Sequence, residues 1–341
     1  MKGQENKILV TGGLGYIGSH TCVELIQNGL EVVIVDNLSN SKLEVLDRIE
    51  KITGVKPDFH QIDVTNKKEL ASVFSTYSLD KVIHFAAYKA VGESQKLAAD
   101  YYYNNLNSLT ILLSVMKEFD IKKLVFSSSC TVYGTADKIP VDESESIKNA
   151  ESVYGTTKIM GEKIIADITQ SEFQLKAVIL RYFNPVGAHE SGLIGENPNG
   201  VPNNLFPVVL EAINGTRESL AIFGNDYDTK DGTAVRDYIH VVDLAQAHVQ
   251  ALNYLDKSDS RLDYFNIGTG VGNSVLEVIQ QFEKEINKPI NYSFEKRREG
   301  DIEKIWADSS KALKKMNWKA THRLEDMVKS SMNWNKQKNG K

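Results

Sequence analysis

A tyrosine and a lysine stand four residues apart within residues 153–158, as Tyr154 and Lys158. If this stretch is helical, the two side chains lie on one face of the helix, one turn apart. A lysine ammonium beside a phenol favours the phenolate, so Tyr154 could act as a general base near neutral pH. Lowering the pKa of a phenol by about 3 units takes roughly 4 kcal/mol, so we expect the charge of a bound cofactor to contribute. The pair alone is weakly specific, because ordinary surface helices also contain it.

Three glycines follow an apolar run near the amino end of the chain. The run covers residues 7–11, and Gly12, Gly15 and Gly18 lead into a helical pattern. A strand, a glycine turn and a helix in this order bring backbone N–H groups and a helix N-terminus against a pyrophosphate. The spacing departs from that of ordinary dinucleotide dehydrogenases, in which one residue separates the first two glycines. The alternative is a glycine-rich turn of a flavodoxin-like fold that binds no nucleotide.

An acidic residue follows the next apolar run, residues 31–35. This residue, Asp36, stands 18 positions after Gly18. A carboxylate at the end of the second strand suits the two ribose hydroxyls of NAD and repels the additional phosphate of NADP. Residues 37–40 contain no arginine that could bind that phosphate. Together with the glycine turn, Asp36 therefore predicts an NAD site.

Three consecutive serines, residues 127–129, follow the apolar run 123–126. Ligands of parallel sheets bind at the carboxyl ends of the strands, so serine hydroxyls at this point would face the cleft. A serine could then hydrogen-bond the same substrate oxygen that Tyr154 deprotonates. Alternatively, the serines cap the following turn, and the sequence does not decide between these two roles.

The first half of the chain alternates strand and helix patterns. Apolar runs typical of buried parallel strands cover residues 81–87, 123–127 and 177–183, and helical patterns separate them at 102–118 and 154–169. This order predicts an α/β fold, a Rossmann-type doubly wound parallel sheet with right-handed crossovers. We therefore expect an NAD-binding Rossmann domain over residues 1–183.

The sequence changes in character after residue 183. Residues 187–207 are rich in glycine, asparagine and proline and predict a loop over a ligand. Residues 184–341 are expected to form mainly a smaller, interleaved C-terminal α/β substrate domain. A segment of about 235–255 is expected to return to the first domain, and the polar tail 336–341 to fray. Short strands are predicted at 220–223 and 264–267, and helices at 242–255, 274–286 and 324–334.

The composition of the 341 residues is that of a globular protein, with 41% hydrophobic and 25% charged residues. A net charge of −5 offers no basic surface for nucleic acid.

Residues 1–6 show no signal peptide and no stretch approaches the ~18 apolar residues of a membrane span, so we expect a cytoplasmic protein without membrane contact. The two cysteines, Cys22 and Cys130, are too few for a disulfide framework and lack the spacing of a zinc site, and we expect no metal.

Several motifs resemble a known group of enzymes. The glycine motif within residues 11–20, the serine run and the pair Tyr154 and Lys158 resemble the extended short-chain dehydrogenase/reductase superfamily. Within it, the chain is similar to the UDP-glucose 4-epimerases of the NAD-dependent epimerase/dehydratase family, from about Lys7 to Trp334. The motifs that carry this narrower resemblance are residues 84–94, 181–189, 221–227, 236–241 and 297–301.

This resemblance implies an isomerase that interconverts UDP-galactose and UDP-glucose, a reaction of galactose metabolism. Tyr154, assisted by Lys158 and the nicotinamide charge, would remove the proton of the sugar 4-hydroxyl while hydride passes from C4 to NAD. The 4-keto sugar would rotate and take the hydride back on its opposite face, so NAD would stay bound. Ser129, 25 residues before Tyr154, corresponds to the family's catalytic serine and would relay or orient the proton.

The resemblance also implies binding residues. Contacts to NAD are implied for Gly12, Gly15, Tyr16, Ile17, Gly18, Asp36, Asn37, Asp63, Val64, Phe85, Ala86, Ala87, Lys89, Asn104, Ser129, Tyr154, Lys158 and Phe183. Contacts to the UDP-sugar are implied for Lys89, Ser129, Tyr154, Phe183, Asn184, Asn203, Asn204, Leu205, Arg236, Arg298 and Asp301. Arginine suits a diphosphate because its planar fork matches phosphate oxygens. As alternatives, Arg236 could form a surface ion pair with Asp237, and Arg297 could be a solvated neighbour of Arg298.

Ile305 bears on the range of substrates. At this position some members of the family carry a tyrosine that excludes N-acetylated sugars, and others a small residue that admits them. We expect UDP-glucose and UDP-galactose to be the main pair, with weak activity on N-acetylated forms. The alternative is a UDP-N-acetylglucosamine 4-epimerase or an epimerase of dual specificity.

Two other classes of protein with this fold would show different residues near the serine run or at the tyrosine–lysine pair. A sugar-nucleotide 4,6-dehydratase would carry an acidic pair after a threonine near the serine run, and Thr131 is followed by Val132. A non-catalytic NAD-sensing regulator would usually lose the tyrosine or the lysine of the catalytic pair.

Members of the family are usually dimeric, so a homodimer is expected. Apolar residues at 101–116 and 159–168 would form its interface, or else belong to the core.

Overall fold

The computed structural model describes residues 6–298 and 300–340. Residues 1–5, 299 and 341 lie outside the described part, and with them most of the amino-terminal stretch expected to contain no signal peptide. Within the described part, no helix is long and apolar enough to cross a lipid bilayer.

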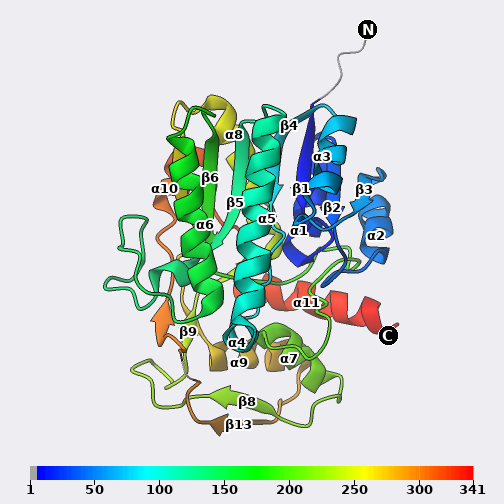
Figure 1. The fold of residues 1–341 in the computed structure, drawn as a ribbon. Helices are drawn as coiled ribbons and strands as arrows, with labels where there is room; N and C mark the ends of the chain where they lie inside the picture. Colours follow the sequence, from blue (N-terminus) through cyan, green and yellow to red (C-terminus); the bar gives the residue numbers. More distant parts are fainter. Residues whose placement is uncertain (1–5, 299, 341) are drawn as a thin grey trace.

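A seven-stranded sheet forms the centre of the larger part of the molecule, and all of its strands run parallel (Figure 1). The strands have continuous apolar runs because both faces of the sheet are covered. The strand order β11-β6-β5-β4-β1-β2-β3 reverses its direction between β1 and β4. The strands are β1 (Lys7–Thr11), β2 (Val32–Asp36), β3 (Asp58–Gln61), β4 (Leu79–His84), β5 (Lys123–Ser129), β6 (Lys176–Tyr182) and β11 (Leu262–Ile267).

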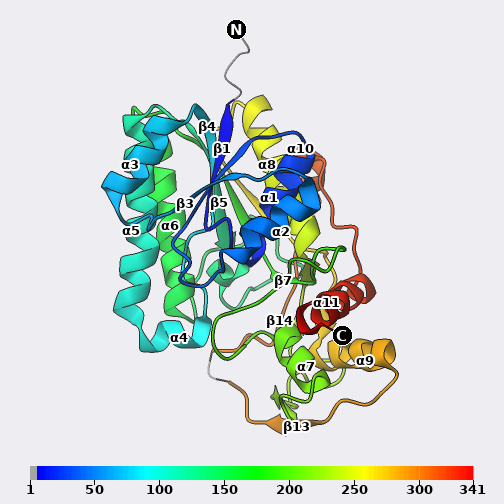
Figure 2. The same ribbon diagram turned by 90° about the vertical axis from the view of Figure 1, so that its right-hand side faces the viewer.

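Helices cover both faces of this sheet (Figure 2). A separate hydrophobic cluster lies under each layer, which confirms the predicted doubly wound α/β fold. One layer contains α1 (Tyr16–Gln27), α2 (Glu44–Thr53), α8 (Val241–Lys257) and α10 (Ser310–Met316). The other contains α3 (Lys67–Thr76), α5 (Ala98–Glu118) and α6 (Val153–Thr169), and the short α4 (Val91–Lys96) precedes α5.

Three elements of the carboxyl-terminal half complete this larger part. Helix α8 packs against α1, β11 pairs with β6, and α10 contacts both α8 and β11. Residues 264–267 were expected in the smaller domain, but they belong to the edge strand of the large sheet. The reason is that Phe265 and Ile267 pack into one of its two cores and Tyr264 against the other.

The smaller part of the molecule lies below the large sheet in Figure 1 and is built from short sheets. A third hydrophobic cluster, with Phe206, Phe282 and Met327, joins its helices. The paired strands are β7 (Asn184–Val186) with β10 (Tyr238–His240), β8 (Leu220–Phe223) with β13 (Tyr292–Glu295), and β9 (Val235–Arg236) between β12 (Asn273–Ser274) and β14 (Lys304–Ile305). The helices are α7 (Leu205–Ile213), α9 (Val275–Ile286) and α11 (Leu324–Asn339).

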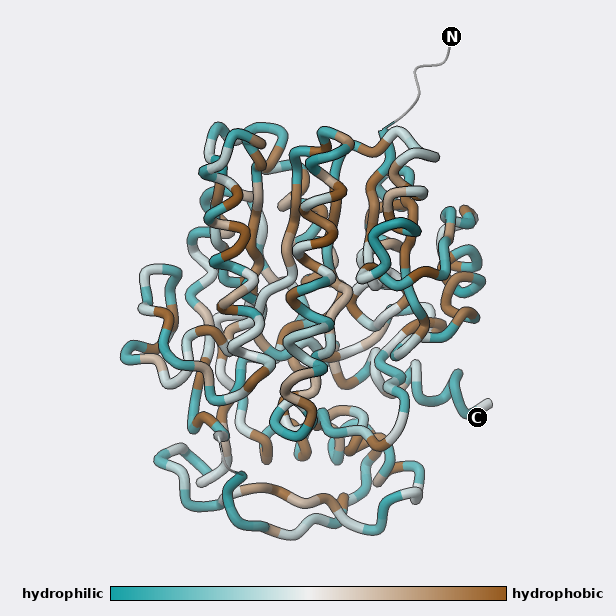
Figure 3. The backbone as a smooth tube through the Cα atoms, viewed as in Figure 1, coloured by the Kyte–Doolittle hydropathy of each residue, from teal (hydrophilic) through white to brown (hydrophobic). Residues whose placement is uncertain are grey.

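Two local predictions in this part need correction. The loop expected over residues 187–207 ends earlier, because α7 begins at Leu205. The tail expected to fray from residue 336 is helical as far as Asn339, because α11 continues through it, and residue 341 lies outside the described part. Figure 3 shows hydrophobic segments along the sheet and its helices and mostly hydrophilic outer loops.

Candidate active site

The glycine turn connects β1 to α1 at the carboxyl end of the large sheet. Gly12 has a φ of +70°, and a Cβ there would lie 2.9 Å from the backbone nitrogen of Ala86. A Cβ on Gly18 would lie 2.2 Å from the carbonyl oxygen of Gly12, so this close approach of helix and turn requires glycine. The turn leaves the N-terminus of α1 at a pocket, which is an arrangement suited to an anion.

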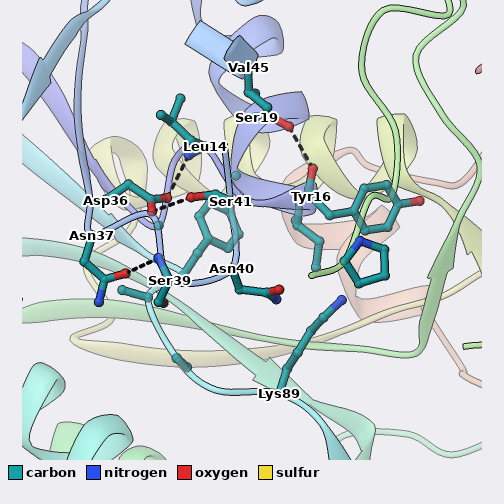
Figure 4. Close-up of a pocket in the computed structure, with 18 of the residues that line it drawn as sticks. Leu14, Tyr16, Ser19, Asp36, Asn37, Ser39, Asn40, Ser41, Val45 and Lys89 are labelled. Atoms are coloured by element: carbon teal, nitrogen blue, oxygen red, sulfur yellow. Dashed lines mark hydrogen bonds between the residues drawn. The ribbon is translucent and has the colours of Figure 1, made fainter. Parts of the chain in front are cut away.

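Asp36 ends β2 beside this turn (Figure 4). Its carboxylate accepts hydrogen bonds from the Leu14 N–H at 3.1 Å, the Leu38 N–H at 2.9 Å and the Ser41 hydroxyl at 2.7 Å. These three donors fix the carboxylate and leave one of its roughly four acceptor positions for a ligand. A ribose hydroxyl suits that position, so the turn and Asp36 together fit NAD.

One pocket gathers most of the predicted cofactor-binding residues, and Ser129 and Phe183 are not among its lining. The pocket is also lined by residues 194–198, which lie in the loop predicted to cover a ligand. The predicted residues in the lining are Gly12, Gly15, Tyr16, Ile17, Gly18, Asp36, Asn37, Asp63, Val64, Phe85, Ala86, Ala87, Lys89, Asn104, Tyr154 and Lys158.

Arg48 and Trp334 line the same pocket, and sequence reasoning missed both. They come from α2 and α11, far apart in the chain, and the Arg48 guanidinium lies 5.4 Å from the centre of the Trp334 ring. Arg48 also donates a hydrogen bond to the carbonyl oxygen of Leu193 at 3.2 Å. Neither position has a motif around it, so only the packing of distant segments could identify them.

Tyr154 and Lys158 lie in the first turns of α6, which Ser152 caps by accepting a hydrogen bond from the Gly155 N–H at 3.1 Å. Both side chains are almost fully buried. The Lys158 ammonium lies 5.8 Å from the centre of the Tyr154 ring. The predicted spacing on one helix face therefore brings the ammonium beside the phenol ring.

The protein's own groups raise the pKa of the Tyr154 phenol well above its usual value, because burial outweighs a hydrogen bond with Ser129. Burial also lowers the pKa of Lys158 to about 8, against the opposing effect of Glu162. The predicted lowering of the phenol pKa by Lys158 is therefore not found among the described groups. The ammonium donates to the carbonyl oxygen of Ser127 at 2.7 Å and faces the ring, while burial remains the main cause of the raised pKa of the phenol. A base near neutral pH needs a further positive charge, as the sequence analysis expected from a cofactor.

Ser129 fills the capping role that the sequence left open, and its hydrogen bond to a substrate oxygen stays a prediction. Its hydroxyl oxygen accepts a hydrogen bond from the Thr131 N–H at 3.3 Å and so caps the turn after β5. The same side chain hydrogen-bonds the Tyr154 phenol, which lowers the pKa of that phenol. Ser129 can therefore orient the phenol while it stabilises the turn.

A buried ion pair holds α6 against the sheet. The Glu162 carboxylate accepts hydrogen bonds from the Ser128 hydroxyl at 2.6 Å and from Nε and Nη2 of Arg181 at 3.0 and 2.6 Å. Arg181 also donates from Nη1 to the Tyr133 hydroxyl at 3.0 Å. Because this network joins α6, β5 and β6, it fixes the position of the tyrosine–lysine pair relative to the sheet. Sequence reasoning missed it, although Arg181 belongs to one of the recognised motifs.

The predicted substrate arginines lie in the smaller part and outside the cofactor pocket. The Arg236 guanidinium pairs loosely with Asp301 at 3.8 Å. The alternative of an ion pair with Asp237 is wrong, because the Asp237 carboxylate is fully buried and accepts hydrogen bonds from other residues. The Arg298 guanidinium lies 3.8 Å from the centre of the Phe223 ring.

Arg297 is not simply a solvated neighbour of Arg298. Its Nε lies 2.7 Å from the Asp226 carboxylate, and its guanidinium lies 4.1 Å from the centre of the Tyr227 ring. Arg297 is nevertheless exposed, as the alternative expected, and its partners lie in the turn after β8.

The remaining predicted substrate residues fall into two groups. Lys89 and Asn204 meet at one side chain, since both donate hydrogen bonds to Glu196, at 3.1 and 2.6 Å. Asn203 is exposed beside Asn204, Leu205 begins α7, and Asn184 begins β7. Phe183 lies in a buried cluster with Cys130 and Ile305. The structure thus brings the cofactor residues together more closely than the substrate residues.

The fold and the pocket define the class of this protein. The profile of the NAD dependent epimerase/dehydratase family matches residues 8–268, and the chain belongs to that family. It is 50% identical to the UDP-glucose 4-epimerase of Dictyostelium discoideum over 97% of this chain and 96% of that protein. It is also 50% identical to the Bacillus subtilis UDP-glucose 4-epimerase, over 96% of each. A Bifidobacterium longum UDP-glucose 4-epimerase solved with NAD+ and UDP has a TM-score of 0.94 and 46% identity over 98% of this chain and 99% of that one.

Proposed function

We propose that this protein interconverts UDP-galactose and UDP-glucose by epimerisation at C4 of the sugar, with NAD as a retained cofactor. The observation that carries the proposal is that Tyr154 and Lys158 line the same pocket as the glycine turn and Asp36. A base and a dinucleotide site in one pocket suit the oxidation of a carbon that bears a hydroxyl. Similarity to UDP-glucose 4-epimerases along nearly the whole chain supports a UDP-sugar as the substrate.

Within this proposal the glycine turn and Asp36 would hold NAD, which would supply a reversible hydride acceptor for C4 of the sugar. Tyr154 takes the proton of the 4-hydroxyl and gives it back, and the hydrogen bond from Ser129 orients the phenol. Lys158, fixed by the Ser127 carbonyl oxygen, keeps an ammonium beside the phenol ring. Because the tyrosine and the lysine are buried, bulk water is kept away from the proton transfer.

The UDP part is proposed to bind in the smaller part of the molecule. Arg236 and Arg298 would hold the diphosphate, with Asn184, Asn203, Asn204, Leu205 and Asp301 around it. The pair of Arg236 with Asp301 is loose and half-exposed on the carboxylate side, so phosphate oxygens can compete for the guanidinium. Anchoring at UDP leaves the sugar free to turn over, which epimerisation through one hydride site requires.

We also propose that Ile305 affects which UDP-sugars the protein accepts. Its side chain packs with Phe183, a proposed substrate contact, and is 2% exposed. Isoleucine leaves more room than tyrosine would, yet it offers no hydrogen bond to an acetamido group. We therefore propose weak turnover of N-acetylated UDP-sugars. Equal kcat/KM for UDP-galactose and UDP-N-acetylgalactosamine would overturn this part of the proposal.

A cytoplasmic homodimer acting in galactose metabolism is a further part of the proposal. The two free cysteines are buried thiols, which suits a reducing compartment. Tyr101 and Ile165 belong to the core, whereas Tyr103 and Met160 are exposed on the adjacent helices α5 and α6. These two exposed side chains support a dimer face on α5 and α6, which sedimentation of the purified protein would test.

The deciding experiment incubates purified protein with UDP-galactose and no added NAD, and measures UDP-glucose. We expect product from the wild type and from Tyr292→Phe, an exposed tyrosine of β13, and a loss of roughly 10²–10⁴-fold in Tyr154→Phe. Absence of product even with added NAD would contradict the proposal and favour a non-catalytic NAD-binding protein.

A further inference from the structure

Glu196 is a nearly buried acid between the two parts of the molecule. It lies in the segment between β7 and α7, and its side chain is 8% exposed. It lines the cofactor pocket, where its charge raises the pKa of Tyr16 in addition to the larger effect of burial. An acid in such a position requires partners, because an unpaired buried charge is unfavourable.

Two donors from different parts of the molecule meet at one oxygen of this carboxylate. The Lys89 ammonium, from the loop after β4, lies 3.1 Å from Glu196 Oε1. The Asn204 side-chain amide, at the start of α7, donates to the same oxygen at 2.6 Å. Figure 4 shows Lys89 reaching into the pocket from the side opposite Ser19 and Val45. Glu196 is therefore a direct polar link between a proposed NAD contact and a proposed UDP contact.

The backbone on both sides of Glu196 is held in place. A Cβ on Gly195 would lie 2.6 Å from the Trp334 ring, so the ring packs directly on the backbone there. The Trp334 indole N–H lies 3.4 Å from the carbonyl oxygen of Glu196. Further along, the Asn199 N–H donates a hydrogen bond to Asn40 Oδ1 at 3.2 Å, and its side-chain amide donates to the Ser39 carbonyl oxygen at 3.1 Å. The carboxylate thus starts from a fixed backbone, as a positioning group must.

We propose that Glu196 is a positioning residue that aligns Lys89 for the cofactor and Asn204 for the UDP part of the substrate. This inference rests on the proposed function, because it assumes that the two partners contact NAD and UDP. Loss of the carboxylate frees both donors at once, so it weakens cofactor retention and substrate binding together. The chemical step depends on the tyrosine–lysine pair and changes less.

The test compares Glu196→Ala with Glu190→Ala, an exposed acid of the same segment, both as holoenzymes. Three quantities are measured: the rate at which NAD leaves gel-filtered protein, KM and kcat for UDP-galactose, and the melting temperature. For Glu196→Ala we expect NAD release and KM each to increase roughly tenfold, as for loss of hydrogen bonds to a charged group, with a smaller change in kcat. For Glu190→Ala we expect no change. Glu196→Gln keeps the shape and one acceptor oxygen, so its effects should be intermediate and it guards against a variant that fails to fold.

Two outcomes overturn the proposal. One is equal NAD release and equal KM in Glu196→Ala and Glu190→Ala. The other is a lower melting temperature of Glu196→Ala with NAD release and KM unchanged, which would indicate a purely structural role. If the wild type does not convert UDP-galactose, the proposed function fails, but the comparison of NAD release between the two variants still decides whether Glu196 positions Lys89.

Discussion

The larger and smaller parts of this molecule build their sites in different ways. In the larger part, the predicted cofactor residues come from the ends of neighbouring parallel strands and from the helices beside them, and nearly all line one pocket. In the smaller part, the predicted substrate residues come from β7, β9, the start of α7 and the segment after β13. The difference shows that a parallel sheet gathers its functional residues by geometry, because all of its carboxyl ends meet at one edge.

The smaller part depends instead on contacts between segments that are remote in sequence. The buried Asp237 carboxylate accepts hydrogen bonds from the N–H groups of Thr269, Gly270 and Ala307 at 2.9 to 3.1 Å. These bonds tie two loops, one after β11 and one after β14, to the residue that follows Arg236. Sites of this kind are assembled by individual side chains, so single substitutions should affect the two parts differently.

The largest effect is expected from Gly18→Ala in the glycine turn. Alanine favours a helix by about 1 kcal/mol over glycine, but its Cβ would lie 2.2 Å from the Gly12 carbonyl oxygen. We expect a loss of roughly 3 kcal/mol or more in stability together with loss of NAD, as for other severe steric overlaps. Gly92→Ala, where nothing lies within 4 Å of a Cβ, should be neutral or slightly stabilising. Thermal unfolding and bound NAD would measure both, and a stable, NAD-containing Gly18→Ala would contradict the geometry of the turn.

Arg236→Ala should weaken substrate binding in the smaller part and leave the cofactor site of the larger part unchanged. We expect the KM for UDP-galactose to increase roughly 10- to 100-fold, because a charge-assisted contact to the diphosphate is lost. Bound NAD should be unchanged, since Arg236 does not line the cofactor pocket. Lys230→Ala, an exposed residue of the same part, provides the control. Loss of NAD from Arg236→Ala would show that the cofactor site depends on the smaller part.

Acid should destabilise mainly the larger part. Burial lowers the pKa of three histidines there from the usual 6.5, to about 3 for His20 and His84 and about 4 for His248, whereas among the described residues of the smaller part only His240 has a pKa lowered to about 4. The unfolded chain takes up protons below pH 6.5 and the folded chain does so only near these lower values, so stability falls as the pH decreases from 6.5 toward 4. Each such histidine contributes about 1.4 kcal/mol per pH unit in that range.

Thermal unfolding at pH 7, 6 and 5 would measure this slope, and His248→Gln should make it shallower. The contribution of His322 to stability changes with pH in the opposite direction. A hydrogen bond to Asp243 raises the pKa of His322, so its contribution is present below pH 6.5 and is lost as the pH rises through the folded-state pKa. Stability that does not change between pH 7 and 5 would be inconsistent with neutral, buried histidines.

The smallest effect is expected from Asn199→Ala, at the junction of the two parts. Its side chain donates to the Ser39 carbonyl oxygen at 3.1 Å and so ties the loop over the cofactor pocket to the loop after β2. Loss of one such bond, worth about 1 kcal/mol, should speed NAD release several-fold. Asn253→Ala on the exposed side of α8 serves as the control. Equal release rates would show that this hydrogen bond does not retain the cofactor.

Sequence patterns predicted the larger part well because its signals are local. The run at residues 7–11 is β1, and the tyrosine–lysine spacing lies on α6 as expected. The pKa of Tyr154 was not predictable in the same way, because among the protein's own groups burial raises it, and burial depends on the packing of the whole fold. Likewise, residues 264–267 have an ordinary strand pattern, and only pairing with β6 assigns them to the large sheet.

By itself, the sequence determined the doubly wound sheet, the glycine turn, the acid that ends β2 and the spacing of the tyrosine–lysine pair, since each depends on residues that are neighbours in the chain. Only the tertiary structure decided that Arg48 and Trp334 share a wall of the cofactor pocket and that Glu196 joins Lys89 to Asn204. These contacts join segments more than one hundred residues apart, with the single exception of Glu196 and Asn204. No local pattern specifies such contacts, because they arise only when the two parts pack together.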